Sequence, residues 1–107
     1  IDARKKYMMT TNAYAMPKHI AYPFIRRGYA YLMLKNYSEA INDFTMVIDL
    51  KPDNAMSYYL EGFAYYYRGL AYDKLGNHQQ AHIDLKIAAR LGHEPAQDTL
   101  RKLGERW

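Results

Sequence analysis

The sequence predicts an all-α fold, and two observations support this prediction. Helical spacing of apolar residues dominates the chain, with Gly, Pro and Asn between the periodic segments, whereas Asn-Gly and Asp-Gly hairpin signals are absent. One hairpin pattern also recurs at a constant offset: Gly28, Asn36, Tyr37, Ala40 and Phe44 reappear, in the same order and spacing, as Gly69, Asn77, His78, Ala81 and Leu85. We therefore expect two stacked helical hairpins, and we call the shift from Gly28 to Gly69 the repeat offset.

Six amphipathic segments are predicted to be helices: residues 2–16, 19–35, 38–50, 55–75, 78–91 and 95–104. In the first, one side carries Ala3, Tyr7, Thr10 and Tyr14. Pro23 is expected in the first turn of the second helix or at its true start, because a later proline removes a backbone hydrogen bond. Gly76 and Gly92 mark helix ends. The last helix and its tail carry a one-sided stripe that should dock on the preceding pair: Ala96, Leu100, Leu103 and Trp107.

The fourth helix contains the same short pattern twice within residues 58–72, YYLEGFAYYYRGLAY. Tyr58, Gly62 and Tyr65 form the first copy, and Tyr65, Gly69 and Tyr72 form the second. The offset of seven residues rotates the helix by about 700° and lengthens it by about 10 Å, so both copies keep nearly one face. We expect the first copy to pack on the first hairpin and the second copy on residues 78–91, which leaves aromatic surface exposed.

Length and composition allow one domain with a core and exclude several classes of protein. The chain has 107 residues, half of them hydrophobic, which argues against a disordered tail. No apolar run approaches the roughly 18 residues of a membrane span, and the absence of cysteine excludes disulfides and cysteine-based metal sites. Because the chain begins at Ile1, we expect a fragment or a processed form. The sequence does not determine the cellular compartment of the protein, and the cytoplasm is slightly favoured.

The repeated pattern resembles the tetratricopeptide repeat, a 34-residue helix-turn-helix unit. The first unit meets its signature through Phe24, Gly28, Tyr31, Ala40, Phe44 and Pro52. Arg27 replaces the usual Leu before the glycine. In the second unit, either copy in the long helix can supply the glycine and the tyrosine of the signature, as Gly62 with Tyr65 or as Gly69 with Tyr72. Ala81 and Leu85 supply the positions that follow. His93 stands where a proline is expected. Residues 88–100 are also similar to Sel1-like repeats.

The resemblance implies a right-handed superhelical array of antiparallel helix hairpins in a single domain, residues 1–107. Residues 1–17 are expected to be an N-terminal helix left from a preceding repeat. Residues 18–54 form the first full repeat, residues 55–94 the second repeat with its elongated first helix, and residues 95–107 a C-terminal capping helix. Each unit buries only one side by itself, so the units must stack.

The resemblance also implies a non-catalytic interaction module or scaffold that binds a peptide or a partner helix in a concave groove. Carried over by position, the groove residues are Tyr22, Ile25, Tyr29, Leu32, Met33, Met56, Tyr59, Phe63, Tyr66 and Tyr67. Tyrosine suits such a surface because it combines a large rigid area with a polar tip. Ile25 and Tyr29 occupy two places of the Lys/Asn set that clamps a C-terminal carboxylate in some relatives, so binding of such tails is not expected.

Two alternatives stay open at this point. The offset Tyr-rich helix could make the chain a self-assembly unit that forms a homodimer or an end-to-end oligomer. Nucleic-acid binding is disfavoured, because the net charge is only +4 and the tyrosines lie at packing intervals. Its basis would be the basic set Arg4, Lys5, Lys6, Lys18, Arg26 and Arg27.

No pattern in the sequence indicates catalysis. There is no glycine-rich phosphate loop and no Ser/His/Asp set. His78 and His82 are four residues apart on one helix, which would suit zinc only if further ligands converged on them. Glu61 lies among aromatic residues and seven residues before Arg68, and we interpret it as solvated or paired. We expect no enzyme, no metal and no cofactor.

Overall fold

The computed structural model describes residues 18–49 and 55–107. These ranges contain the helices α2 (Lys18–Met33), α3 (Tyr37–Asp49), α4 (Ala55–Lys74), α5 (His78–Arg90) and α6 (Glu94–Lys102), and no strand. The prediction of an all-α fold is confirmed for this part of the chain. The predicted helix over residues 2–16 lies outside the described residues.

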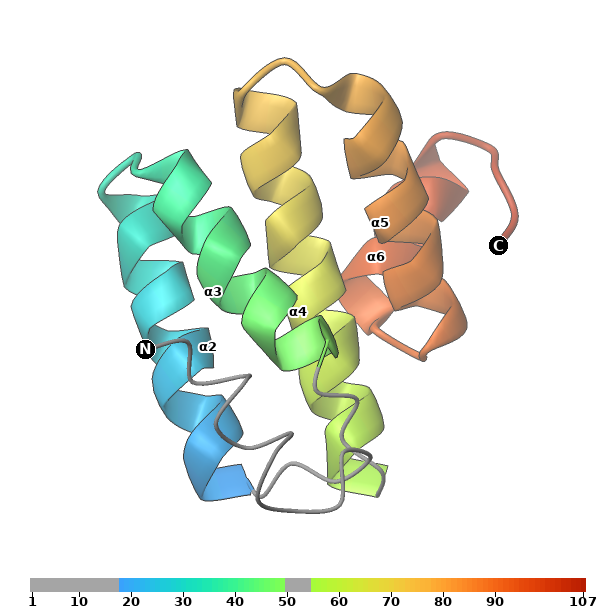
Figure 1. The fold of residues 1–107 in the computed structure, drawn as a ribbon. Coiled ribbons are helices and arrows are strands. Elements are labelled where there is room, and N and C mark those ends of the chain that lie inside the picture. The colour runs from blue at the N-terminus through green and yellow to red at the C-terminus, as the bar shows by residue number, and fades with distance from the viewer. Residues whose placement is uncertain (1–17, 50–54) are drawn as a thin grey trace.

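The helices form two antiparallel hairpins that stack side by side (Figure 1). α2 packs against α3, and α4 packs against α5. α4 also contacts both helices of the first hairpin, mainly α3, and thereby joins the two units. α6 packs against α5 and begins the next layer of the array.

Pro23 lies deeper in its helix than expected. α2 already begins at Lys18, so the proline falls in the second turn instead of the first. The missing N–H leaves one carbonyl of the preceding turn without its helical bond. Pro23 itself is exposed, while Ala21 and Ile25 on either side of it are buried in the core. Tertiary packing therefore holds this turn against the local preference of proline.

The turns that close the two hairpins have the same backbone conformation. Lys35 has φ +64° and Gly76 has φ +87°, and these two positions are related by the repeat offset. A left-handed residue at this point lets the next amide bond back to the helix, as Asn36 N does to the Tyr31 carbonyl and Asn77 N to the Tyr72 carbonyl. The repeat therefore extends to the turn, even though only the second hairpin uses glycine there.

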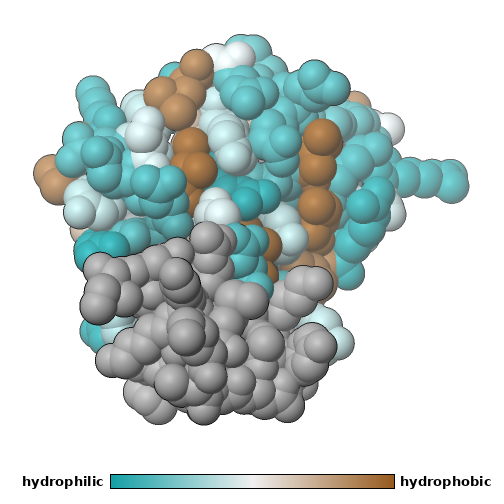
Figure 2. All heavy atoms as spheres, in the orientation of Figure 1, coloured by the Kyte–Doolittle hydropathy of each residue, from teal (hydrophilic) through white to brown (hydrophobic). Residues whose placement is uncertain are grey.

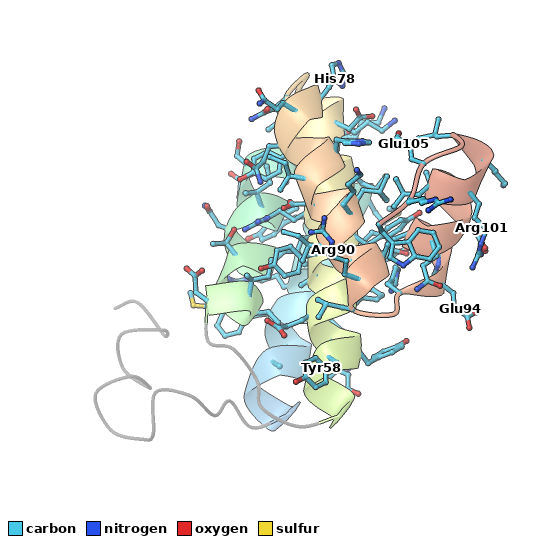
Figure 3. All side chains as sticks on the ribbon, turned by 90° about the vertical axis from the view of Figure 1, so that its right-hand side faces the viewer. Tyr58, His78, Arg90, Glu94, Arg101 and Glu105 are labelled. Carbon is cyan, nitrogen blue, oxygen red and sulfur yellow. The ribbon has the colours of Figure 1, made fainter. Side chains whose placement is uncertain are left out.

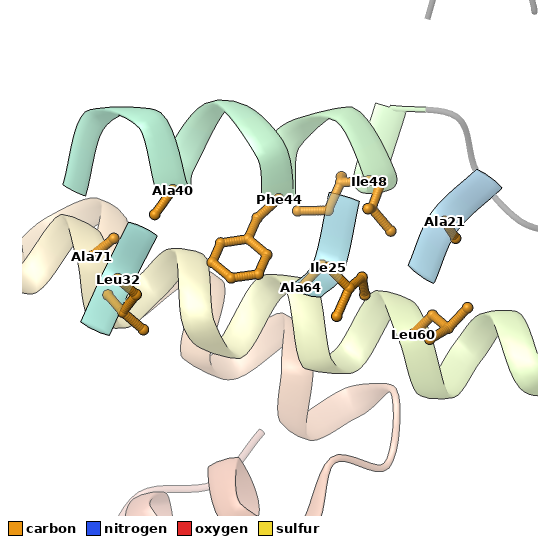
Figure 4. Packing of buried hydrophobic residues seen from close by; sticks show 10 residues of the cluster. Ala21, Ile25, Leu32, Ala40, Phe44, Ile48, Leu60, Ala64 and Ala71 are labelled. Atoms are coloured by element: carbon orange, nitrogen blue, oxygen red, sulfur yellow. The ribbon is translucent and has the colours of Figure 1, made fainter. Parts of the chain in front are cut away.

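A single core cluster joins α2, α3 and α4. In Figure 4, Ala40, Phe44 and Ile48 of α3 point toward α4, where Leu60, Ala64 and Ala71 face them. Phe44 is fully buried, and its ring stacks on Tyr67 with 6.3 Å between the centroids. Phe44 thus fills the space between the two hairpins. A smaller cluster of Ala88, Ala89, Ala96 and Leu100 joins α5 to α6.

α4 is one unbroken helix of 20 residues, and its second glycine sets the register of the second repeat. A Cβ atom on Gly69 would lie 3.2 Å from Asp84 Cβ, just as one on Gly28 would lie 3.2 Å from Asp43 Cβ. The positions of these two glycines are therefore equivalent, which decides between the two registers that the sequence allows.

The first copy of the pattern in α4 differs from the expectation. Leu60 and Ala64 do pack on the first hairpin. Gly62, however, lies under the end of the second hairpin, where an added Cβ atom would be 3.3 Å from His93 Cβ and 3.7 Å from Leu91 Cβ. Because the two glycines are seven residues apart, they share one face, and α5 with its following turn covers that whole face.

The C-terminal stripe is only half buried. Ala96 and Leu100 are fully buried, but Leu103 is 60% and Trp107 is 37% exposed. α6 ends at Lys102, and Gly104 at φ +72° turns the chain, so the helical spacing stops before these residues. Trp107 instead lies beside the guanidinium of Arg101, whose Cζ is 5.3 Å from the ring centroid.

The described residues on the face shown in Figure 2, where α3 lies in front, are mainly hydrophilic, with narrow strips of hydrophobic residues between polar ones. Within residues 18–49 and 55–107, none of the helices combines the length and the apolar character needed to cross a membrane.

Candidate functional site

A buried carboxylate pairs with an arginine between the two helices of each hairpin. Arg27 donates from Nε to Asp43 at 2.8 Å and from Nη2 at 2.7 Å. Arg68 donates in the same way to Asp84, at 2.8 and 2.9 Å, and its Nη1 reaches Thr45 of α3 at 3.1 Å. Burial lowers the pKa of Arg68, but Asp84 outweighs this effect and raises the pKa overall. Both arginines therefore stay charged.

Sequence reasoning missed these pairs. Arg27 stands where the repeat usually has Leu, and the pattern treats this as a mild departure. The signal was present, because the repeat offset that relates Gly28 to Gly69 also relates Arg27 to Arg68 and Asp43 to Asp84. Oppositely charged residues that recur together at one spacing indicate a geometry that is repeated within the chain itself.

Four aromatic side chains of α2 and α4 form a continuous cluster. The Tyr29 ring meets Tyr67 edge-on at 5.3 Å, and Phe63 lies 4.4 Å from Tyr67. Tyr66 packs edge-on against Tyr67 at 5.1 Å and extends the cluster to His93 at 4.7 Å. These contacts bring together residues that the sequence placed in the groove from two separate helices.

Hollows flank this cluster and share its residues. One hollow of about 580 Å³ lies between α4 and the α5–α6 turn, and its walls include Tyr59, Phe63 and His93. Two smaller hollows of about 480 and 490 Å³ lie between α2 and α4, and Arg26 and Phe63 line both. We call these three hollows, which all share Phe63 and lie from α2 across α4 to the α5–α6 turn, the aromatic groove.

The structure places the predicted groove residues in three different surroundings. Five of them line the hollows of the groove, Tyr22, Tyr29, Tyr59, Phe63 and Tyr67, whereas Tyr66 joins the ring cluster without lining any of these hollows. Ile25 and Leu32 are only 6% and 7% exposed and belong mainly to the core, although Ile25 borders two hollows. Met33 is exposed but lines none of these hollows. Met56 lies on α4, and its side chain is outside the described part.

Several residues that line the groove were not predicted, and Arg26, Tyr58 and His93 are among them. Arg26 is an exposed cation on its α2 side. Tyr58 stands at the opening beside α6, where Figure 3 shows it near the N-terminal end of α4. His93 forms part of the far wall. Sequence reasoning took His93 only as a replacement for the proline of the repeat, because nothing local shows that the α5–α6 turn folds back over Gly62.

His93 is a titratable residue in the wall of the aromatic groove. Its pKa is shifted, and this shift affects its charge near neutral pH. Its Nε2 atom is buried and has no hydrogen-bond partner within the described part of the chain. Burial lowers its pKa from the ordinary value of 6.5. Burial also raises the pKa of Tyr67 in the same cluster, so both side chains are uncharged at neutral pH.

We expect the His93→Phe substitution to stabilise the protein and to change its pH dependence. The unfolded chain binds a proton at His93 more readily than the folded chain, so the free energy of unfolding falls as the pH drops below about 6.5 and levels off below the lowered pKa. Phe cannot bind a proton, so this pH-dependent loss of stability disappears. Phe also removes the buried nitrogen that lacks a hydrogen-bond partner, which should raise the free energy of unfolding by about 1 kcal/mol at neutral pH. Urea unfolding of both proteins between pH 7 and 5 measures the free energy of unfolding and its pH dependence.

The control for this prediction is His82→Gln, because His82 Nε2 pairs with Glu105 at 2.9 Å on the surface. This variant should keep the stability loss that His93 contributes at low pH. If His93→Phe and the wild type lose stability in parallel between pH 7 and 5, His93 does not titrate as described.

The two histidines that the sequence considered for zinc have separate partners. His78 Nδ1 contacts Asp73, and His82 contacts Glu105. Across residues 18–49 and 55–107, no three side chains of His, Asp or Glu converge in a way that could hold a metal ion. Arg68, which the sequence placed beside Glu61, is paired with Asp84.

Stacked antiparallel hairpins that are related by a constant repeat offset define an α-helical repeat protein. Comparison with family models then identifies the repeat: residues 21–54 and residues 63–85 each match a model of the tetratricopeptide repeat, and the two matches cover more than half of the chain. The chain belongs to the tetratricopeptide repeat family. No curated protein and no solved structure matches it significantly.

The second match supports the register found in the structure, because it contains Gly69 and excludes Gly62. Residues 86–107 lie outside both matches, so the similarity of residues 88–100 to Sel1-like repeats stays a prediction. Tetratricopeptide repeats generally mediate protein–protein interactions, act as scaffolds and are not catalytic.

Proposed function

We propose that the aromatic groove binds a peptide segment or a helix of a partner protein. The observation that carries this proposal is the cluster of Tyr29, Phe63, Tyr66 and Tyr67, which stays partly exposed between hollows on both sides. Rings that already pack against one another lose little side-chain entropy on binding, and aromatic residues dominate the energetics of protein interfaces.

The remaining features of the groove suit a polypeptide ligand. The three hollows that share Phe63 extend across the width of two hairpins, so they can take several side chains of one segment in succession. Tyr hydroxyl groups and Arg26 offer polar contacts at the edges. No positive clamp for a terminal carboxylate is present at Ile25 and Tyr29, so an internal segment fits better than a chain terminus.

Nucleic-acid binding receives no support from the described residues. Of the basic set, Arg27 is engaged by Asp43 through two hydrogen bonds, which leaves it less available to phosphate. Arg26 is the cation of this set that lines the groove. Self-assembly would place a second copy of the chain in the groove, and the experiment below separates it from peptide binding by the mass of the protein.

The test is selection of peptides from a displayed random library on the full chain. Selected peptides should bind the wild type, and Tyr29→Ala or Tyr66→Ala should weaken them at least tenfold, since truncating a central interface aromatic costs about 2 kcal/mol. Leu75→Ala, which removes an exposed apolar side chain outside the groove, should bind as the wild type does.

Circular dichroism must show that the variants stay folded. Selected peptides that bind all variants equally would place the binding surface elsewhere. A mass above that of the monomer in the wild type, reduced by Tyr29→Ala, would favour self-assembly through the same groove.

A further inference from the structure

Two charges of opposite sign border the aromatic groove, one at each end. Arg26 of α2 lines both hollows between α2 and α4. Glu94 lines the third hollow, on the other side of α4, and Figure 3 shows it at the start of α6. The other described residues that line these hollows are aromatic, aliphatic, glycine or proline, apart from His93, which is uncharged at neutral pH. The groove is therefore mainly apolar, with a positive end at α2 and a negative end at α6.

Both charged side chains are exposed and available to a ligand. The neighbouring Arg27 is held by Asp43 through two hydrogen bonds, but Arg26 has no carboxylate partner within residues 18–49 and 55–107. On α6, Asp98 pairs with an arginine of its own helix, whereas Glu94 has no cationic partner in the same ranges. A charged ligand therefore meets both groups without breaking an ion pair of the protein.

We propose that the groove selects a partner segment with an acidic side chain at one end, apolar or aromatic side chains in the middle and a basic side chain at the other end. This inference rests on the proposed function, because it specifies the chemistry of the segment that the groove binds. The acidic side chain lies at Arg26 and the basic one at Glu94. A segment that lies the other way brings like charges together at both ends, so the two residues determine its direction.

The middle of the groove supplies the affinity and the two ends supply the selectivity. Phe63 borders all three hollows, and Tyr59 and Tyr67 each border two of them. Aromatic surface at the centre of an interface carries most of its binding energy. Exposed charges at the edge contribute little affinity, about threefold each, but they discriminate strongly against ligands with the wrong sign of charge.

Glu94 also lies in the first turn of α6, where a carboxylate is favoured by the helix dipole. Glu39 provides a matched control for this structural role. It is exposed in the first turn of α3 and lines none of the three hollows. Arg90 is the corresponding control for Arg26, because it is an exposed arginine at the end of α5 that also lies outside these hollows.

The test measures the dissociation constants of peptides selected from a displayed random library on the full chain. Selected peptides should carry one acidic and one basic residue on either side of an apolar stretch. Arg26→Gln should weaken such a peptide about threefold, but it should not affect a version whose acidic residue is replaced by its amide. Glu94→Gln should show the same coupling to the basic residue alone. Arg90→Gln and Glu39→Gln should bind as the wild type does.

A charge-swapped protein gives the strongest expected effect. The double variant Arg26→Glu with Glu94→Arg should prefer a peptide whose acidic and basic residues are exchanged over the original peptide by about tenfold, and the wild type should show the opposite preference. High salt should reduce both preferences, because it screens exposed charges. Circular dichroism checks that the variants stay folded.

Three results would overturn the inference, and they differ in what they say of the proposed function. Peptides that Tyr29→Ala weakens, but that show no coupling to Arg26 or Glu94, would leave peptide binding in the groove intact and remove only the selection by charge. Peptides that Tyr29→Ala does not affect would remove both. A dimeric wild type that becomes monomeric on Arg26→Gln would assign the groove to a second copy of the chain.

Discussion

The Asp84→Ala substitution should lower the free energy of unfolding by about 3–5 kcal/mol, because it leaves a buried guanidinium without its partner. Asp84 is fully buried and Arg68 is only 13% exposed. With the carboxylate gone, Arg68 keeps one protein acceptor, Thr45 Oγ1, and water cannot replace the rest without opening the contact between the hairpins. Chemical denaturation followed by circular dichroism measures the loss.

The first hairpin supplies a matched control for this substitution. Asp43 makes the same two hydrogen bonds with Arg27, but Arg27 is 59% exposed and water can solvate it when the carboxylate is removed. Asp43→Ala should therefore cost only about 1 kcal/mol. Equal losses of stability in the two variants would mean that burial does not determine how much each ion pair contributes to the free energy of unfolding.

The Phe44→Ala substitution should cost a similar amount, about 3–5 kcal/mol, through a cavity between the hairpins. The Phe44 ring is fully buried, stacks on Tyr67 and lies against Gly28, where an added Cβ atom would be 3.0 Å from the ring. Gly28 cannot fill the space that the ring leaves, because it has no side chain. Thermal and urea unfolding measure the loss of stability.

Leu85 is the matched control, since it occupies the equivalent position in the second hairpin and is only partly buried. Leu85→Ala should cost about half as much, because less apolar surface returns to water in the folded state. Phe44→Ala should also weaken the contact between the hairpins and lower the cooperativity of unfolding, whereas Leu85→Ala should not. A Phe44→Ala variant as stable as the wild type would contradict this account of the core.

The sequence predicted the helices and their stacking because these depend on local spacing. Each described helix begins and ends within two residues of its predicted bounds, since glycine, proline and apolar periodicity act over a few residues. The extent of the groove was predicted less well. Ile25 and Leu32 fit the family positions but are buried, and His93 and Arg26 reach the groove only through the way the units pack.

By itself, the sequence determined an all-α repeat with one elongated helix, because the doubled pattern of residues 58–72 and the repeat offset can both be read from the order of residues alone. Only the tertiary structure decided which glycine of α4 is equivalent to Gly28 and which face Gly62 presents. Two registers that differ by seven residues share one helical face, so periodicity alone cannot separate them. Long-range contacts separate them: Arg68 reaches Asp84, and His93 covers Gly62.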